Sequence, residues 1–149
     1  MKQVYTDASF TWQSTERTDE PVVRGKIAVA GEGLKIVEKV AVGKVPGLKQ
    51  YINILELVAI ARAIEIAHQR RWEPDLRVTT DSKVAMIWAS SGKVSPKIST
   101  DAHVQALEYL ARVKKEHGGI ITFYFTPREK NPAGWLLSEE LEREAPHTI

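Results

Sequence analysis

The sequence predicts a single α/β domain over residues 1–149, in which one mixed β-sheet carries helices on both faces. Three β-rich segments precede the first helix, and strands and helices alternate after it. The length of 149 residues, with 43% hydrophobic and 27% charged residues, suits one globular domain. This composition excludes a disordered or fibrous chain.

The first half of the chain is expected to supply three strands and the strongest helix. The β-rich segments that predict strands are 2–10, 25–31 and 34–42. Glu32-Gly33 between the last two strands is typical of a tight hairpin turn. The polar or Pro- and Gly-containing segments that predict loops are 11–24 and 43–50. Residues 52–71 are rich in Ala, Leu and Ile and predict a helix whose polar face holds Arg62, Glu65 and Gln69.

The second half alternates shorter strands with helices. Strands are predicted at 76–80 and 120–126, and helices at 82–89, 101–117 and 132–144. Thr100 or Asp101 can cap the helix 101–117, whose side chains expected to face inward are Val104, Leu107, Leu110 and Ala111. Asn131-Pro132 is typical of a helix cap followed by a first-turn proline.

Composition limits the environment and the chemistry of the protein. Cysteine is absent, which excludes disulfide scaffolds, thiol nucleophiles and cysteine-bound zinc, and fits the reducing cytoplasm. No apolar run approaches the roughly 20 residues of a membrane helix, and the segment 1–7 does not resemble a signal peptide. We therefore expect a cytoplasmic protein without a membrane partner. The net charge of +2 permits a polyanionic partner but does not require one.

Two of the five aspartates occupy unusual places. Asp7 lies inside an apolar strand, where Asp is disfavoured, and Asp81 closes a strand directly before a helix. Taken singly, Asp7 could be a satisfied polar residue near a strand end, and Asp81 could be the N-cap of the next helix.

Glu56 lies on the apolar side of the first helix. Its stripe consists of Ile52, Ala59, Ala63 and Ile66. The ordinary interpretation is a partly exposed glutamate near a helix start, which gains from the helix dipole. A carboxylate on an apolar face otherwise needs a cationic partner or a metal.

The three acids together predict a metal site. If the strand that ends at Asp81 lies beside the first strand, Asp7, Glu56 and Asp81 converge at one edge of the sheet. Three carboxylates cannot remain ionised close together without a counter-charge. A hard divalent cation with oxygen ligands, usually Mg²⁺, is the simplest solution.

Four motifs carry a resemblance to a known family: Tyr5-Thr6-Asp7-Ala8-Ser9, Asn53-Ile54-Leu55-Glu56-Leu57, Thr79-Thr80-Asp81-Ser82-Lys83 and Asn131-Pro132-Ala133. In this order, over nearly the whole chain, they resemble the type 1 ribonuclease H family. The first and third motifs are also similar to the ribonuclease H domains of retroelement reverse transcriptases.

The resemblance implies a five-stranded mixed sheet in the ribonuclease H-like fold. It implies an endonuclease that hydrolyses the RNA strand of an RNA–DNA hybrid with two Mg²⁺ ions, for which Mn²⁺ can substitute. Two metals about 4 Å apart can clamp one phosphate, which suits carboxylate ligands. The implied catalytic and metal-binding residues are Asp7, Glu56 and Asp81, with Asp7 bridging both ions. The implied partner is the hybrid, bound by a monomer.

The substrate-binding residues that the resemblance implies are Ala8, Ser9, Asn53, Arg128 and Lys130. Asn53, one turn before Glu56, would lie in the minor groove of the hybrid. Arg128 and Lys130 would bind phosphate, although a solvated basic loop explains them equally well.

Position 134 departs from the family pattern, which has a fourth acid after Asn-Pro-Ala where this chain has Gly134. Because Gly costs up to about 1 kcal/mol relative to Ala in a helix, the backbone change in Gly134→Asp is expected to be neutral or mildly stabilising. The candidate replacement ligands are Glu129, Ser138, Glu139 and Glu140, of which Glu139 and Glu140 are better explained as solvated residues.

Three functions remain open at this stage. The leading hypothesis is a hybrid-cleaving endonuclease, weakened by Gly134. The second is an impaired nucleic-acid-binding module of the same fold, for example from a mobile element. The third is another nuclease or transposase of the same superfold, because fold alone does not determine function. The position of Glu56 on the first helix argues against the third.

Overall fold

The computed structural model describes residues 1–10, 22–44, 51–94 and 100–144. Its strands are β1 (Lys2–Phe10), β2 (Val22–Gly31), β3 (Leu34–Lys44), β4 (Leu76–Thr80) and β5 (Ile121–Phe125). Its helices are α1 (Tyr51–Gln69), α2 (Lys83–Ser91), α3 (Asp101–His117) and α4 (Pro132–Glu144), with a 3₁₀ turn at Arg128–Lys130 before α4. The predicted order of strands and helices is confirmed.

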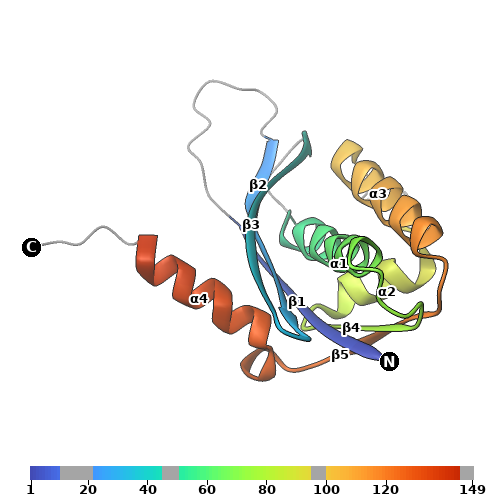
Figure 1. The fold of residues 1–149 in the computed structure, drawn as a ribbon. Coiled ribbons are helices and arrows are strands. Elements are labelled where there is room, and N and C mark those ends of the chain that lie inside the picture. The colour runs from blue at the N-terminus through green and yellow to red at the C-terminus, as the bar shows by residue number, and fades with distance from the viewer. Residues whose placement is uncertain (11–21, 45–50, 95–99, 145–149) are drawn as a thin grey trace, which may run out of the picture.

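The five strands form one mixed sheet in the order β3-β2-β1-β4-β5 (Figure 1). The central strand β1 pairs with β2 in the antiparallel sense and with β4 in the parallel sense. Thr6 of β1 lies opposite Thr80 of β4 in this register. Because β1 and β4 are parallel, the residues that follow these two positions reach the same edge of the sheet.

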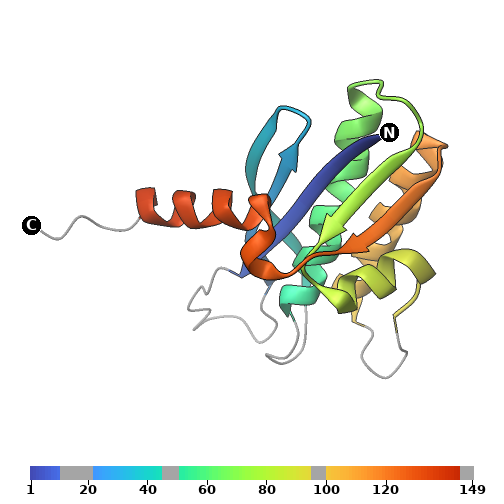
Figure 2. The ribbon, with the colours of Figure 1, turned by 90° about the horizontal axis from the view of Figure 1, so that it is seen from below.

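Helices cover both faces of the sheet. Helices α1, α2 and α3 lie on one face, and α4 lies on the other against β1, β2 and β3 (Figures 1 and 2). The main core lies under α1, where Ile54, Leu57 and Ile60 are completely buried. A smaller cluster of Ala28, Ala30, Ala133 and Leu137 holds α4 against the sheet. The small alanine side chains allow the start of α4 to approach the strands closely.

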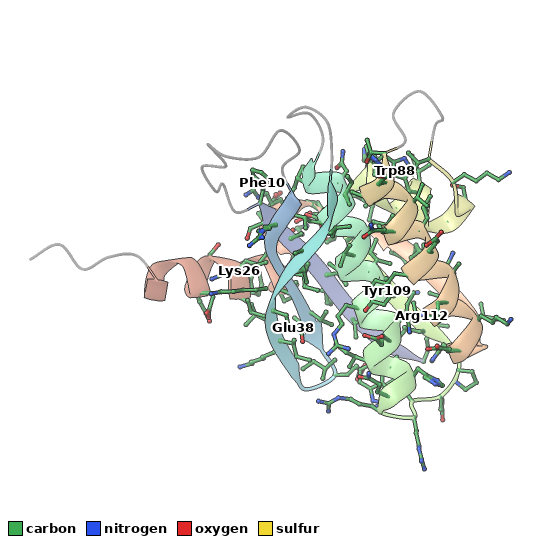
Figure 3. The ribbon with its side chains drawn as sticks, turned by 90° about the horizontal axis from the view of Figure 1, so that it is seen from above. Phe10, Lys26, Glu38, Trp88, Tyr109 and Arg112 are labelled. Carbon is green, nitrogen blue, oxygen red and sulfur yellow. The ribbon has the colours of Figure 1, made fainter. Side chains whose placement is uncertain are left out.

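The polar face of α1 lies between β3 and α3. Arg62 donates a hydrogen bond to Glu38 of β3 at 2.7 Å, and another to Glu65 at 2.7 Å. Tyr109 of α3 donates to the same Glu65 at 2.8 Å, and Arg112 lies nearby (Figure 3). This network connects α1 to two neighbouring elements through charged hydrogen bonds.

The structure corrects the inward face predicted for α3 in part, since Leu110 is buried and Leu107 packs against the core as predicted. Val104 and Ala111 are exposed, whereas the buried residues are Ala102, His103, Ala106, Leu110 and Val113. The helix carries two stripes with apolar residues, and the one with Ala102 and Ala106 packs inward. Thr100 is the N-cap, and its hydroxyl accepts a hydrogen bond from the backbone N–H of His103.

Strands β2 and β3 are longer than predicted. Strand β2 begins at Val22, within the predicted loop 11–24, and β3 continues to Lys44. Pairing across the β2–β3 hairpin extends both strands beyond their β-rich centres.

None of the helices in the described ranges has the length and apolar character needed to cross a bilayer.

Candidate metal centre

Three acids from separate elements come together at one edge of the sheet. Asp7 lies on β1, Asp81 directly follows the parallel strand β4, and Glu56 lies on α1. One carboxylate oxygen of each residue lies within 4.8 Å of the other two. The structure therefore brings together the three acids that the sequence analysis singled out.

Two of the three carboxylates are withdrawn from solvent. Glu56 is 4% exposed and Asp7 is 8% exposed, while Asp81 is half-buried. The backbone N–H of Ala8 donates to Oδ1 of Asp7 at 2.9 Å and to Oε1 of Glu56 at 3.3 Å. The second oxygen of Glu56, Oε2, is buried without a hydrogen-bond partner. Such an atom is costly unless a ligand satisfies it.

Burial and mutual repulsion disfavour the charged forms of these acids. Burial raises the pKa of Glu56 well above its ordinary value, and the negative charge of Asp7 raises it further. Burial also raises the pKa of Asp81, as does Asp7, while the hydrogen bond from Asn131 and the charge of Arg128 act in the opposite direction. A metal ion would reverse this balance by stabilising the ionised carboxylates.

A divalent cation fits this group of residues. In the described part of the chain, no lysine or arginine forms an ion pair with any of the three acids. The donor atoms are carboxylate oxygens, which hard cations such as Mg²⁺ and Mn²⁺ prefer. In the metal-free protein a proton shared with Asp7 can satisfy the Glu56 carboxyl, and a bound cation would take the place of that proton.

Asp81 is not the cap of the helix that follows it. Ser82 is the N-cap of α2, and its hydroxyl accepts a hydrogen bond from the backbone N–H of Ala85 at 3.1 Å. The ordinary interpretation of Asp81 as a helix cap is therefore wrong. Its carboxylate remains available to the acidic cluster.

Asn131 holds Asp81 in place, a role that the sequence did not reveal. Its side-chain Nδ2 donates to the carbonyl of Thr6 at 2.9 Å and to Oδ2 of Asp81 at 3.2 Å. Its Oδ1 accepts from the backbone N–H of Ala133 at 3.1 Å, which confirms the predicted cap of α4. The side chain is completely buried. One amide therefore joins the start of α4 to β1 and to the metal centre.

Gly134 lies against Asp7. A β-carbon built at position 134 would be 2.9 Å from Oδ2 of Asp7. A side chain at this position would thus point at the acidic cluster, as the fourth acid of the resembled family requires. The atom that a β-carbon would meet is the far end of the Asp7 side chain, so the expectation of a neutral or mildly stabilising backbone change stays a prediction, while in the absence of metal the new carboxylate would repel Asp7.

None of the candidate replacement ligands joins the cluster. The acidic group within the described residues consists of Asp7, Glu56 and Asp81 alone. Glu129 and Glu139 are exposed, and the Ser138 hydroxyl donates to the carbonyl of Gly134 at 3.1 Å. None of these side chains therefore places an oxygen beside Asp7 in the way that a fourth acid at position 134 would.

A cleft beside the acids contains most of the predicted substrate-binding residues. Ala8, Ser9, Asn53 and Arg128 line it together with the three acids, whereas Lys130 lies outside it on the exposed turn before α4. Lys83 adds a second basic side chain to the lining. Phe10, the last residue of β1, adds an aromatic one (Figure 3). The cleft thus combines buried acids with basic and apolar side chains.

Comparison with solved structures shows which fold this is. LC11-RNase H1, isolated from compost by a metagenomic approach and solved in complex with an RNA/DNA hybrid, is 18% identical, with 98% of this chain and 100% of that chain covered and a TM-score of 0.62. This chain has the ribonuclease H fold. The fold that the motifs implied is confirmed, including the five-stranded mixed sheet with helices on both faces.

Two further solved structures with the ribonuclease H fold are similar over nearly the whole chain. RNase H1 from the halophilic archaeon Halobacterium salinarum NRC-1 is 14% identical, with 95% and 98% of the two chains covered and a TM-score of 0.60. The N-terminal RNase H domain of a Mycobacterium tuberculosis protein is 14% identical, with 97% and 100% covered and a TM-score of 0.56. No protein-family model and no curated protein matches the sequence.

Proposed function

We propose that this protein is a metal-dependent endonuclease that hydrolyses the RNA strand of RNA–DNA hybrids. The observation that carries the proposal is the acidic cluster in a ribonuclease H fold, in which Glu56 has a buried carboxylate oxygen without a partner. The RNA/DNA hybrid bound to the similar LC11-RNase H1 supports the choice of substrate.

The acids are suited to hold two Mg²⁺ ions, with Mn²⁺ as an alternative. Bound divalent ions supply charge stabilisation of the reacting phosphate and an activated water. Asp7 would contribute to both ions, and Glu56 and Asp81 to one. The Ala8 N–H orients two of these carboxylates, and Asn131 orients the third. The protein thereby holds its ligands in position before metal and substrate arrive.

The lining of the cleft supports binding of a nucleic-acid backbone. Arg128 and Lys83 place positive charge beside the acids, where a phosphate would lie. Asn53 offers an amide to the minor groove, and its Oδ1 is held by the Ser82 hydroxyl at 3.4 Å. Such contacts recognise a hybrid by its shape and its 2′-hydroxyls rather than by base sequence.

Gly134 supports a second candidate function, a nucleic-acid-binding module with little or no catalysis. Position 134 faces Asp7 but provides no oxygen, so one of the two ions has fewer protein ligands. Substrate phosphate and water can replace a missing ligand on Mg²⁺. For this reason the hydrolytic function, in weakened form, remains the preferred proposal.

Cleavage of a labelled RNA–DNA hybrid tests the proposal directly. The protein should cut the RNA strand of the hybrid in Mg²⁺ or Mn²⁺ and leave matched DNA and RNA duplexes intact, and Asp7→Asn should be inactive. Metal-dependent binding of the hybrid without any cleavage would favour the binding module. Equal cleavage of all three duplexes would contradict the assigned substrate.

A further inference from the structure

A large aromatic side chain is exposed beside the turn that precedes α4. Trp135 directly follows Gly134 in the first turn of α4 and is 56% exposed. Its indole Nε1 donates a hydrogen bond to the backbone carbonyl of Glu129 at 3.3 Å. The ring is therefore held by one edge against the turn that precedes α4, while much of its surface remains in water.

Trp135 lies beside the turn that connects the acidic cluster to α4. The β-carbon position of Gly134 lies 2.9 Å from Oδ2 of Asp7 and 4.0 Å from the carbonyl of Arg128. Trp135 follows Gly134 in the chain, but its side chain points about 100° away from the direction of position 134, and its ring contacts the turn 128–130 through the carbonyl of Glu129. Arg128 of this turn lines the cleft of the acids.

Two other exposed aromatic residues, Tyr124 and Phe125, already have a cation–π partner. The Arg77 guanidinium lies 4.0 Å from the centre of the Tyr124 ring, and the Lys83 ammonium lies 5.0 Å from that of Phe125. Trp135 makes no ring–ring or cation–π contact with any described residue. An exposed indole held by its N–H is suited to accept a flat ligand on its free surface.

The turn beside Trp135 carries the charge that a nucleotide needs. Arg128 and Lys130 are both exposed there, together with one acid, Glu129, so the turn has a net positive charge. A nucleotide presents a flat base to an aromatic ring and a phosphate to basic side chains. Within a duplex both faces of each internal base are covered by its neighbours, so the ring is best suited to a base that has left the duplex.

We propose that Trp135, with Arg128 and Lys130, forms a subsite for an unpaired nucleotide of the strand held at the metal centre. This inference rests on the proposed function, in which that strand is RNA. The protein then binds hybrids whose RNA strand continues into a single-stranded extension more tightly than blunt hybrids. The preferred substrate is the junction between a hybrid and single-stranded RNA.

Binding measured without divalent metal tests the subsite independently of cleavage. Dissociation constants are measured in EDTA for a blunt hybrid and for hybrids with a short RNA extension or a short DNA extension at either end. The preference for an extension is the dissociation constant of the blunt hybrid divided by that of the extended hybrid. Trp135→Ala should reduce the preference for one RNA extension by about fivefold to about 150-fold, the range expected for the loss of one base–aromatic stack.

Two further variants separate stacking from a general structural effect. Trp135→Phe should retain most of the preference, because phenylalanine keeps an aromatic face. Tyr124→Ala removes an exposed aromatic residue that is not part of the subsite, and it should leave the preference unaltered. Thermal denaturation of each variant shows whether the fold is intact.

The possible outcomes separate this inference from the proposed function. Cleavage of the blunt hybrid by the unmodified protein, combined with no loss of preference in Trp135→Ala, would overturn the subsite and leave the function in place. A third outcome is that the unmodified protein prefers the RNA extension and Trp135→Ala loses that preference, while neither protein cleaves a hybrid. That result would support the subsite and refute the proposed function. A preference for a DNA extension alone would overturn the assignment to the RNA strand.

Discussion

The backbone of Gly134 lies directly against the carboxylate of Asp7. A β-carbon at position 134 would be 2.9 Å from Oδ2 of Asp7, closer than carbon and oxygen atoms normally approach. This proximity follows from the position of α4, which Asn131 and the small residue Ala133 hold close to the sheet. Position 134 is therefore part of the metal centre even though its residue has no side chain.

The first prediction compares Gly134→Asp with Gly134→Ala. Both variants add a β-carbon beside Asp7 and remove a glycine from the helix, so their difference reports the added carboxylate. Without metal, Gly134→Asp should have a lower melting temperature than Gly134→Ala, because four acids then repel one another. With Mg²⁺ the order should reverse, and hybrid cleavage should become faster at lower Mg²⁺ concentration in the aspartate variant.

Alanine variants of Glu129, Glu139 and Glu140 are the controls for this prediction. None of these glutamates belongs to the acidic cluster of the described residues, so their removal should alter the Mg²⁺ titration little. An unaltered titration for Gly134→Asp, together with an inactive glutamate variant, would show that the glutamate supplies the missing ligand.

The second prediction is that Asp7→Asn abolishes cleavage and stabilises the metal-free protein. The asparagine oxygen can still accept the Ala8 N–H, while one of three neighbouring negative charges is removed. The free energy of unfolding in EDTA should rise by about 1 kcal/mol, which corresponds to relief of roughly one unit in a neighbouring pKa. Urea denaturation measures this change. A loss of several kcal/mol would instead assign a structural role to Asp7.

The third prediction concerns the pH dependence of the metal-free protein. Because burial raises the pKa of Glu56, the folded protein retains a proton that the unfolded chain loses above about pH 4.5. The contribution of Glu56 to stability must therefore fall as pH rises from that value, until the pH passes the raised pKa of the folded state. Unfolding free energies in EDTA across this range should decline less in Glu56→Gln than in the unmodified protein.

Added Mg²⁺ provides the control for the pH series. Bound metal favours the ionised carboxylate, so the decline with rising pH should become smaller or disappear. If Glu56→Gln and the unmodified protein show the same pH dependence in EDTA, the raised pKa of Glu56 is refuted.

The fourth prediction is that Asn131→Ala strongly destabilises the protein. It removes hydrogen bonds to Thr6, Asp81 and Ala133 from a completely buried site. At roughly 1 kcal/mol for each lost bond, the expected cost is about 3 kcal/mol. Ser138→Ala, which removes an exposed hydroxyl from the same helix, should change stability by less than about 0.5 kcal/mol. Equal, small losses in both variants would contradict the role of Asn131.

The fifth prediction is that hybrid binding weakens as salt concentration rises. Each basic side chain that contacts phosphate releases about one counterion, which sets the slope of log affinity against log salt. Replacing Arg128 and Lys130 together by glutamine should reduce this slope by about two. An unaltered slope would show that these two residues form a solvated basic turn rather than a phosphate-binding surface.

The sequence by itself determined the order of the strands and helices and the three acids of the metal centre. Periodicity and turn residues report on contacts between near neighbours, which is sufficient to recognise β1 and α1. The acids could be found because Asp7 and Glu56 occupy positions where an apolar residue is expected. Motif order then related these positions to a known fold.

Only the tertiary structure decided which residues meet across the sheet. Asn131 reaches Thr6, which is 125 positions away in the chain, and Gly134 faces Asp7 at a similar separation. The sequence marked Asn131 as a helix cap and as part of a family motif, but not as a partner of Thr6 and Asp81, because these contacts depend on how α4 is positioned over β1. Which side of α3 is buried likewise depends on how the helix packs against α1 and β3. Local patterns carry no information about such distances, since these depend on how separate elements pack together.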